Sequence, residues 1–323
     1  MQYRTFGRTG WKISEIGYGM WGLAGWTGND DRETLSSLDY AVEAGCNFFD
    51  TAWGYGEGAS ERILGDLLKR NSSKKLYVAT KIPPKNFKWP SKSHYKLEEC
   101  FPAEHIIKYT EMSLKNLGVE RIDLQQFHVW EDSWAQQEEW QKAVEQLKRQ
   151  GKIAAMGISV NRWEPANCID TIKTGLIDGI QVIYNIFDQN PEDELFPVCK
   201  EHNVGVIARV PFDEGTLTGL LTKETKFPEG DWRATYFVPE NLISSVEHAD
   251  KLKPLVPSDM TMPEMALRFI LSNKEVATTI PGMRKLHHAK SNLGVSDGKG
   301  LSKELLEKLK EHRWDRVPTS WSQ

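Results

Sequence analysis

The chain has 323 residues, and its 41 Lys and Arg against 45 Asp and Glu give a formal net charge of −4. Hydrophobic residues make up 39% and charged residues 27%, which is typical of a globular protein and excludes a disordered or fibrous one. Basic and acidic residues are interleaved, so we expect no surface for nucleic acid.

The apolar stretches are all shorter than the roughly 18 residues of a membrane span, and the first residues lack the apolar segment of a secretory signal. We therefore expect a cytoplasmic protein without a membrane partner. The four cysteines show no CxxC spacing, which indicates reduced thiols rather than a disulfide framework or a metal site. Because nothing in the composition marks a boundary, we expect a single domain over residues 1–323.

Eight short apolar or β-branched segments alternate with eight helical patterns along the chain. The expected strands are residues 13–19, 47–50, 76–82, 122–128, 153–160, 179–185, 204–210 and 277–281. The expected helices are residues 33–44, 60–69, 102–117, 137–148, 165–174, 191–202, 263–273 and 287–293. Parallel strands need a crossover, which is usually a helix, so the pattern predicts an α/β fold, a (β/α)8 TIM barrel, ahead of a doubly wound sheet.

Three segments lie outside this repeat. A β-hairpin is expected over residues 3–13, an extra helix near residues 242–252, and a C-terminal helix over residues 303–312. Because the hairpin precedes the first strand, we expect it to cover the N-terminal mouth of the barrel.

Titratable residues end three neighbouring expected strands. Asp50 ends the second strand and is followed by Tyr55, while Lys81 ends the third and His128 the fourth. In a barrel, the C-terminal ends of the strands share one rim, where active sites lie. A tyrosine that donates a proton near neutral pH needs a pKa roughly 2 to 3 units below its ordinary value, and the ammonium of Lys81 can lower it. The pattern predicts proton delivery from Tyr55 to a carbonyl, with Asp50 holding Lys81 and His128 orienting the carbonyl oxygen.

Motifs over nearly the whole chain resemble the aldo-keto reductase family. They include Asn47 to Ala52 with Tyr55-Gly56, Ala79 to Lys81, Arg121 to Leu124 with His128, Gly157 to Ser159, Gln181 with Tyr184-Asn185, and Thr279 to Gly282 with Asn292. The resemblance implies a (β/α)8 barrel and reduction of aldehydes or ketones by hydride transfer from NAD(P)H. It also implies that Asp50, Tyr55, Lys81 and His128 form the catalytic tetrad.

The same resemblance implies a cofactor site at the ends of the later strands. Ser159 and Gln181 match the residues that hold the nicotinamide carboxamide, and Arg209 stands where many members have a Tyr stacked on the nicotinamide. Arg284 matches a position that would pair with a 2′-phosphate. The expected cofactor is therefore NADP, with NADPH favoured over NADH. The full expected set is Ser159, Asn161, Gln181, Arg209, Pro211, Phe212, Gly215, Gly219, Gly282, Arg284, His288 and Asn292.

Tryptophans are the expected walls of the substrate pocket. Trp21, Trp53 and Trp130 lie closest to the tetrad in the sequence, and flat indole rings suit a small carbonyl substrate. Four lysines, Lys85, Lys88, Lys92 and Lys96, make the loop after the third strand basic, so it could attract an anionic substrate.

The sequence also allows other functions. Residues 17–22 fit the dinucleotide-binding pattern G-x-G-x-x-G, but the helical pattern starts only near Arg32, whereas a Rossmann helix would open within the motif. A cofactor-sensing regulatory subunit resembling channel-associated β subunits is the alternative function, and a metal-independent barrel hydrolase is a third. The complete tetrad favours the enzyme.

Overall fold

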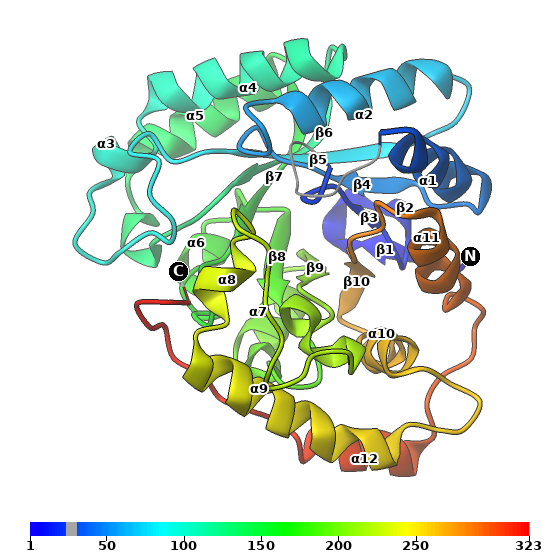
Figure 1. Ribbon diagram of the computed structural model, residues 1–323. Helices are drawn as coiled ribbons and strands as arrows, with labels where there is room; N and C mark the ends of the chain where they lie inside the picture. Colours follow the sequence, from blue (N-terminus) through cyan, green and yellow to red (C-terminus); the bar gives the residue numbers. More distant parts are fainter. Residues whose placement is uncertain (24–30, 323) are drawn as a thin grey trace.

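The computed structural model describes residues 1–23 and 31–322, and its centre is a barrel of parallel strands (Figure 1). Strands that follow one another in the chain pair with one another, from β3 to β10. Isolated bridges between Ile16 and Thr279 and between Gly19 and Gly282 join the first strand to the last. The strands are β3 (Tyr18–Gly19), β4 (Phe48–Asp50), β5 (Tyr77–Ile82), β6 (Ile122–Phe127), β7 (Ile153–Ser159), β8 (Gly179–Ile183), β9 (Gly205–Arg209) and β10 (Val276–Thr279). The predicted (β/α)8 barrel is confirmed.

Helices surround the strands as an outer ring (Figure 1). Each buries one apolar stripe; in α5 the buried residues Trp140, Ala143, Val144 and Leu147 recur at helical spacing and face the barrel. The ring consists of α1 (Asp31–Glu43), α2 (Ala59–Arg70), α4 (Ala103–Leu117), α5 (Glu138–Arg149), α6 (Ile169–Lys173), α7 (Leu195–Glu201), α10 (Met262–Ser272) and α11 (Leu286–Gly294).

Four more helices lie in the connections and near the C-terminus. The predicted extra helix near residues 242–252 is α9 (Pro239–Leu252), and the predicted C-terminal helix is α12 (Lys303–Lys310). Two single-turn helices, α3 (Leu97–Cys100) and α8 (Arg233–Tyr236), belong to loops at the ends of strands. No helix in the described ranges is both long enough and apolar enough to cross a membrane.

The N-terminal hairpin covers one end of the barrel, as expected. Its strands β1 (Tyr3–Phe6) and β2 (Trp11–Ser14) are antiparallel, and Phe6 and Ile13 pack into a buried cluster with residues of the barrel interior. A Cβ at Gly205 would lie 2.5 Å from the Phe6 ring, and a Cβ at Gly179 would lie 2.7 Å from it. Glycine at the first position of two neighbouring strands therefore makes room for the Phe6 ring.

Three expected elements differ most from the structure in their boundaries. Ile13 belongs to β2 rather than to the first barrel strand, which is only Tyr18–Gly19. The helix expected over residues 165–174 begins at Ile169, where the carboxylate of Asp132 accepts hydrogen bonds from the backbone N–H groups of Asp170 and Thr171. The helix expected over residues 191–202 is a 3-10 turn at 190–192 followed by α7. A distant carboxylate thus sets the start of α6.

Candidate active site

A cavity of about 680 Å³ opens at the C-terminal ends of the strands. Asp50, Ser159 and Arg209, the last residues of β4, β7 and β9, line its wall together with Gln181 of β8. Its walls run from Tyr55 and His128 at one end to residues after β10 at the other. Among the residues after β10 that line it are Ile280, Gly282, Met283, Arg284 and His288.

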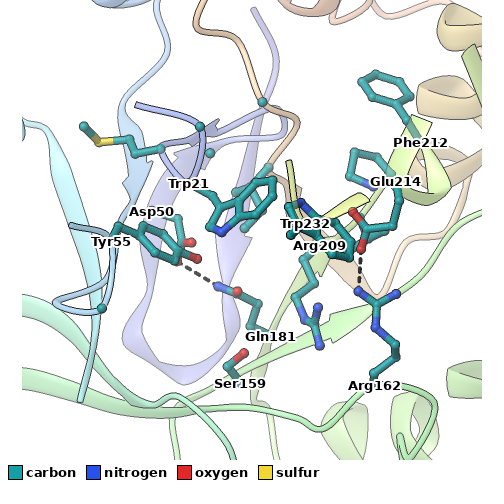
Figure 2. A pocket seen from close by; sticks show the side chains of 18 of the residues that line it. Trp21, Asp50, Tyr55, Ser159, Arg162, Gln181, Arg209, Phe212, Glu214 and Trp232 are labelled. Atoms are coloured by element: carbon teal, nitrogen blue, oxygen red, sulfur yellow. Dashed lines mark hydrogen bonds and ion pairs between the residues drawn. The ribbon is translucent and has the colours of Figure 1, made fainter. Parts of the chain in front are cut away.

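Lys81 links Asp50 to Tyr55 at the inner end of the cavity (Asp50 and Tyr55 in Figure 2). The side chain of Lys81 is 1% exposed, and its Nζ lies 2.5 Å from Asp50 Oδ1 and 3.5 Å from the Tyr55 hydroxyl oxygen. Lys81 Nζ also donates to the backbone carbonyl of Thr51 at 2.8 Å. Because β4 and β5 are adjacent, their ends bring this carboxylate and this ammonium together.

Burial, rather than Lys81, dominates the acidity of Tyr55. Desolvation raises the pKa of Tyr55, and this effect outweighs the lowering by the Lys81 ammonium, part of which Asp50 cancels. The expectation of a lowered pKa for Tyr55 is therefore wrong for the site without ligands. Burial alone would lower the pKa of Lys81, but Asp50 and Tyr55 raise it overall, so Lys81 is an ammonium and Tyr55 a phenol at neutral pH.

His128 lies beside Tyr55 with its ring edge-on, 5.9 Å between ring centroids. Its Nδ1 is buried and has no hydrogen-bond partner among the residues that the structure describes. Burial, followed by the charges of Lys81 and Arg209, holds the pKa of His128 well below its ordinary value. The imidazole is therefore neutral near pH 7 and retains one N–H that can donate to a ligand.

The second oxygen of Asp50 binds two amides. Gln181 Nε2 donates to Asp50 Oδ2 at 2.7 Å, a contact drawn in Figure 2, and Gln126 Nε2 donates to the same oxygen at 3.2 Å. Ser159 lines the cavity next to Gln181. Asn161 also lines it, but its Nδ2 donates to the backbone carbonyl of Trp130 and to Glu131, so this amide already holds the loop after β6.

Two arginines and one glutamate form the wall beyond Ser159 (Figure 2). Arg209 Nη2 donates to the backbone carbonyl of Val160 at 3.0 Å, while Arg162 forms an ion pair with Glu214 at 2.5 Å. Burial, and then the charge of Arg162, lowers the pKa of Arg209 to about 10. Arg162 and Glu214 were not predicted from the sequence, although Arg162 lies three residues after Ser159, the last residue of β7, and Glu214 lies within the loop assigned to the cofactor.

The loop after β9 has a strained backbone. Val210, Asp213 and Glu214 have φ of 55°, 44° and 57°, in the left-handed region that non-glycine residues seldom occupy. Asp213 is buried and binds Arg316 at 2.7 Å, so the C-terminal segment holds this loop. Of the loop residues assigned to the cofactor, Pro211, Phe212 and Gly215 line the cavity, whereas Gly219 does not and instead ends a turn with φ of 71°.

The far end of the cavity is cationic. Arg284 lines it with Arg233, and burial, followed by the charge of Arg233, lowers the pKa of Arg284. Burial is also the main reason that the pKa of His288 is lowered. Asn292 is buried in α11 and does not line the cavity.

The family model for the aldo/keto reductase family matches residues 15–313. The chain belongs to the aldo/keto reductase family. It is 30% identical to the uncharacterized oxidoreductase YqkF of Bacillus subtilis, over 97% of this chain and 96% of the relative. Aldo-keto reductase AKR11C1 from Bacillus halodurans, in its holo form, superposes with a TM-score of 0.78 at 27% identity and covers 100% of both chains.

Two further relatives carry names that describe different functions. The chain is 28% identical to the NADH-specific methylglyoxal reductase of Escherichia coli, over 96% of this chain and 99% of the relative. It is 26% identical to a probable voltage-gated potassium channel subunit beta of Arabidopsis thaliana, over 92% of both chains. This aldo-keto reductase is thus an oxidoreductase of a carbonyl-reducing family, and relatives do not fix its preference between NADPH and NADH.

The tryptophans of this aldo-keto reductase divide between cavity and core. Trp21 lines the cavity and meets Trp232 edge-on at 5.5 Å between ring centroids. Trp130 has no exposed surface and packs stacked on Phe127, with its N–H donated to Thr171, so its assignment to the pocket is wrong. Trp53 does not line the cavity either, because its ring packs edge-on against Tyr109 at 4.8 Å.

Two cavity tryptophans were not expected. Trp89, in the basic loop after β5, lies 5.7 Å from the His128 ring, and Trp232 precedes α8. Only their place in loops after strands could have indicated them. The lysines of the basic loop are exposed and none lines the cavity; they are Lys85, Lys88, Lys92 and Lys96.

Proposed function

We propose that this aldo-keto reductase reduces aldehydes or ketones to alcohols with NADPH or NADH, and that Tyr55 is the general acid. The observation that carries the proposal is the buried chain Asp50–Lys81–Tyr55, which ends beside His128 at the inner end of a 680 Å³ cavity. The complete tetrad supports an enzyme over a cofactor-sensing subunit.

The residues around the cavity fit an extended dinucleotide. Its wall holds buried polar atoms without partners in the described part of the chain, among them His128 Nδ1 and Arg209 Nε, and its far end carries Arg284. In this proposal Ser159 and Gln181 hold the nicotinamide carboxamide, and Gln181 leaves Asp50 when it does so. The loop with Pro211, Phe212 and Gly215 covers the diphosphate, and a 2′-phosphate at Arg284 would favour NADPH. When bound, the cofactor supplies the hydride.

Proton transfer then depends on residues of the chain itself. His128, as a neutral imidazole, donates its N–H to the carbonyl oxygen and orients the substrate. Tyr55 donates its hydroxyl proton to that oxygen as the carbonyl carbon receives the hydride, so one hydride and one proton give the alcohol. The Lys81 ammonium stabilises the resulting phenolate, and Asp50 keeps Lys81 in place. Solvent returns the proton to Tyr55. Trp21, Trp89 and Trp232 would form the wall around a small carbonyl substrate.

Substitution of Tyr55 tests the proposal. In Tyr55→Phe we expect turnover of a panel of small aldehydes and ketones to fall by about 10² to 10⁴, because the proton donor is lost. Cofactor affinity, measured by isothermal titration with NADPH and NADH, should change little because the ring remains. Unchanged turnover would remove Tyr55 from the mechanism. A wild-type protein that binds cofactor but reduces no carbonyl would support the alternative function, a cofactor-sensing regulatory subunit.

A further inference from the structure

The cavity wall beyond Ser159 contains a half-buried cation, Arg209, that has no carboxylate in direct contact among the described residues. Arg209 Nη2 donates to the backbone carbonyl of Val160, and its Nε is buried without a hydrogen-bond partner in the ranges that the structure describes. Glu214, the carboxylate in the same wall, is bound by Arg162 at 2.5 Å. Of the two guanidinium groups in this wall, Arg162 therefore has a carboxylate in direct contact and Arg209 has none in the described part of the chain.

The neighbouring acidic groups bind other cations directly. Asp188 and Asp213 lie 2.5 and 2.7 Å from Arg316, which they share. Asp50 is paired with Lys81 at 2.5 Å. None of these carboxylates forms an ion pair with Arg209 in the described ranges, although the charge of Asp188 favours the charged form of that arginine.

The charge of Arg209 acts on the catalytic end of the cavity. Burial, then Arg162, lowers the pKa of Arg209 to about 10, as expected for a cation that the protein does not compensate. Its charge also contributes to the lowered pKa of His128 and opposes the raised pKa of Tyr55. Anything that lies between His128 and Tyr55 is therefore within the electrostatic reach of Arg209.

Hydride transfer changes the charge at that location. The donor carbon and the carbonyl carbon must approach to about 3 to 3.5 Å, so the nicotinamide ring must lie next to the groups that hold the carbonyl oxygen. The ring is neutral before it gives up the hydride and carries a positive charge afterwards. A positive charge thus forms within reach of Arg209, where it is repelled.

We propose that Arg209 makes the site bind the reduced cofactor more tightly than the oxidised cofactor. This inference rests on the proposed function and concerns its direction, the reduction of the carbonyl by the reduced cofactor. It leaves the overall equilibrium between carbonyl and alcohol unchanged, but it speeds release of the oxidised cofactor and limits inhibition by that product. Arg209 is thus a residue that determines which redox form of the cofactor is retained.

The test compares dissociation constants measured by isothermal titration with NADPH, NADP⁺, NADH and NAD⁺. In Arg209→Met, the ratio of the oxidised to the reduced dissociation constant should fall by about 10- to 100-fold, because a positive charge that lines the cavity is removed. The oxidised form accounts for most of the change. Glu214→Gln should change the ratio in the opposite direction, since it removes the one negative charge of this wall.

Two control variants distinguish an effect of the Arg209 charge from an effect on folding. Arg209→Lys keeps the charge and should keep the ratio. Arg149→Gln removes an exposed arginine at the end of α5 and should leave all four dissociation constants unchanged. The ratio of the wild-type protein should persist at high salt, because buried charges are screened weakly.

Equal weakening of both redox forms in Arg209→Met would mean that the guanidinium binds the cofactor diphosphate, and it would overturn the inference. An unchanged ratio in that variant would overturn it as well. Either result can occur in a protein that reduces carbonyls, so the proposed function would survive. A wild-type protein that binds none of the four dinucleotides would instead overturn the proposed function, and this inference with it.

Discussion

At the scale of single residues, the Lys81–Asp50 pair combines a structural with a chemical role. Both side chains are buried, at 1% and 3% exposure, so neither charge can be removed without leaving the other unpaired in a nearly dry site. Without Lys81, the amides of Gln126 and Gln181 would still donate to Asp50 but would not neutralise its charge. This site therefore couples stability to catalysis.

We predict that Lys81→Met lowers the free energy of unfolding by about 3 to 5 kcal/mol, because Asp50 remains as a buried unpaired charge. Turnover should fall by about 10² or more, because the phenolate of Tyr55 loses its cation. Urea unfolding and carbonyl reduction measure the two effects. The matched control is Lys75→Met: Lys75 pairs with Asp123 at 2.9 Å but is 60% exposed, so its loss should cost less than about 1 kcal/mol. Equal costs in the two variants would contradict this explanation.

His128 gives stability a pH dependence. Its pKa in the folded protein lies well below the value of about 6.5 expected in the unfolded chain, so the unfolded chain binds more protons between these two pKa values. The contribution is fully present above about pH 6.5 and is lost as the pH falls below it, by about 1 kcal/mol for the first pH unit. Urea unfolding at pH 7.5 and 5.5 should show this loss in the wild-type protein and a smaller one in His128→Gln. An identical loss in both proteins would assign the effect to other groups.

At the scale of elements, the hairpin can pack against the barrel because Gly205 has no side chain. A Cβ at Gly205 would meet the Phe6 ring at 2.5 Å, and that ring is fully buried. Because β9 begins at Gly205, the ring and the strand cannot both keep their positions once a methyl group is added.

We predict that Gly205→Ala lowers the free energy of unfolding by about 1 to 3 kcal/mol through overpacking. Gly294→Ala is the control, since nothing lies within 4 Å of a Cβ at this position in α11. It should be neutral or stabilise the protein by up to about 1 kcal/mol, because alanine favours helix. Urea unfolding compares the two, and a neutral Gly205→Ala would show that the hairpin can shift without cost.

The sequence predicted those features that depend on local pattern and strand order. Each expected barrel strand exists because apolar runs alternate with helical stripes, and Asp50, Lys81 and His128 meet because neighbouring strands end together. Features that depend on contacts between residues far apart in the sequence could not be predicted from local patterns. The start of α6 depends on Asp132, and Trp130 is buried because aromatic rings from other elements surround it.

At the scale of the whole molecule, the C-terminal segment is joined to the cavity. Arg316 is buried and shared by Asp188 and by Asp213 of the strained loop, and its guanidinium lies 4.7 Å from the Trp163 ring. Ser322 lines the cavity itself. Residues from both ends of the chain thus complete one barrel, and we propose that residues 1–323 form a single domain.

We predict that Arg316→Gln lowers the free energy of unfolding by about 3 to 5 kcal/mol, because it leaves two buried carboxylates facing each other. It should also weaken NADPH binding, since the loop that contains Asp213 loses its anchor. Arg313→Gln is the control: Arg313 also meets two carboxylates, Asp193 and Asp315, but at an exposed site, so its loss should cost under about 1 kcal/mol. Urea unfolding and isothermal titration measure the two effects, and equal costs would contradict the role of burial.

The bridges that join Ile16 to Thr279 and Gly19 to Gly282 have a consequence for biosynthesis. When the ribosome has made the first strand, the partner that will seal it is still more than two hundred residues from being translated, as the numbering shows. Until then the nascent chain carries an open sheet edge, which other chains can pair with. Closure of the barrel therefore has to wait until β10 has been synthesised, and the sheet edge at β3 stays unpaired until then.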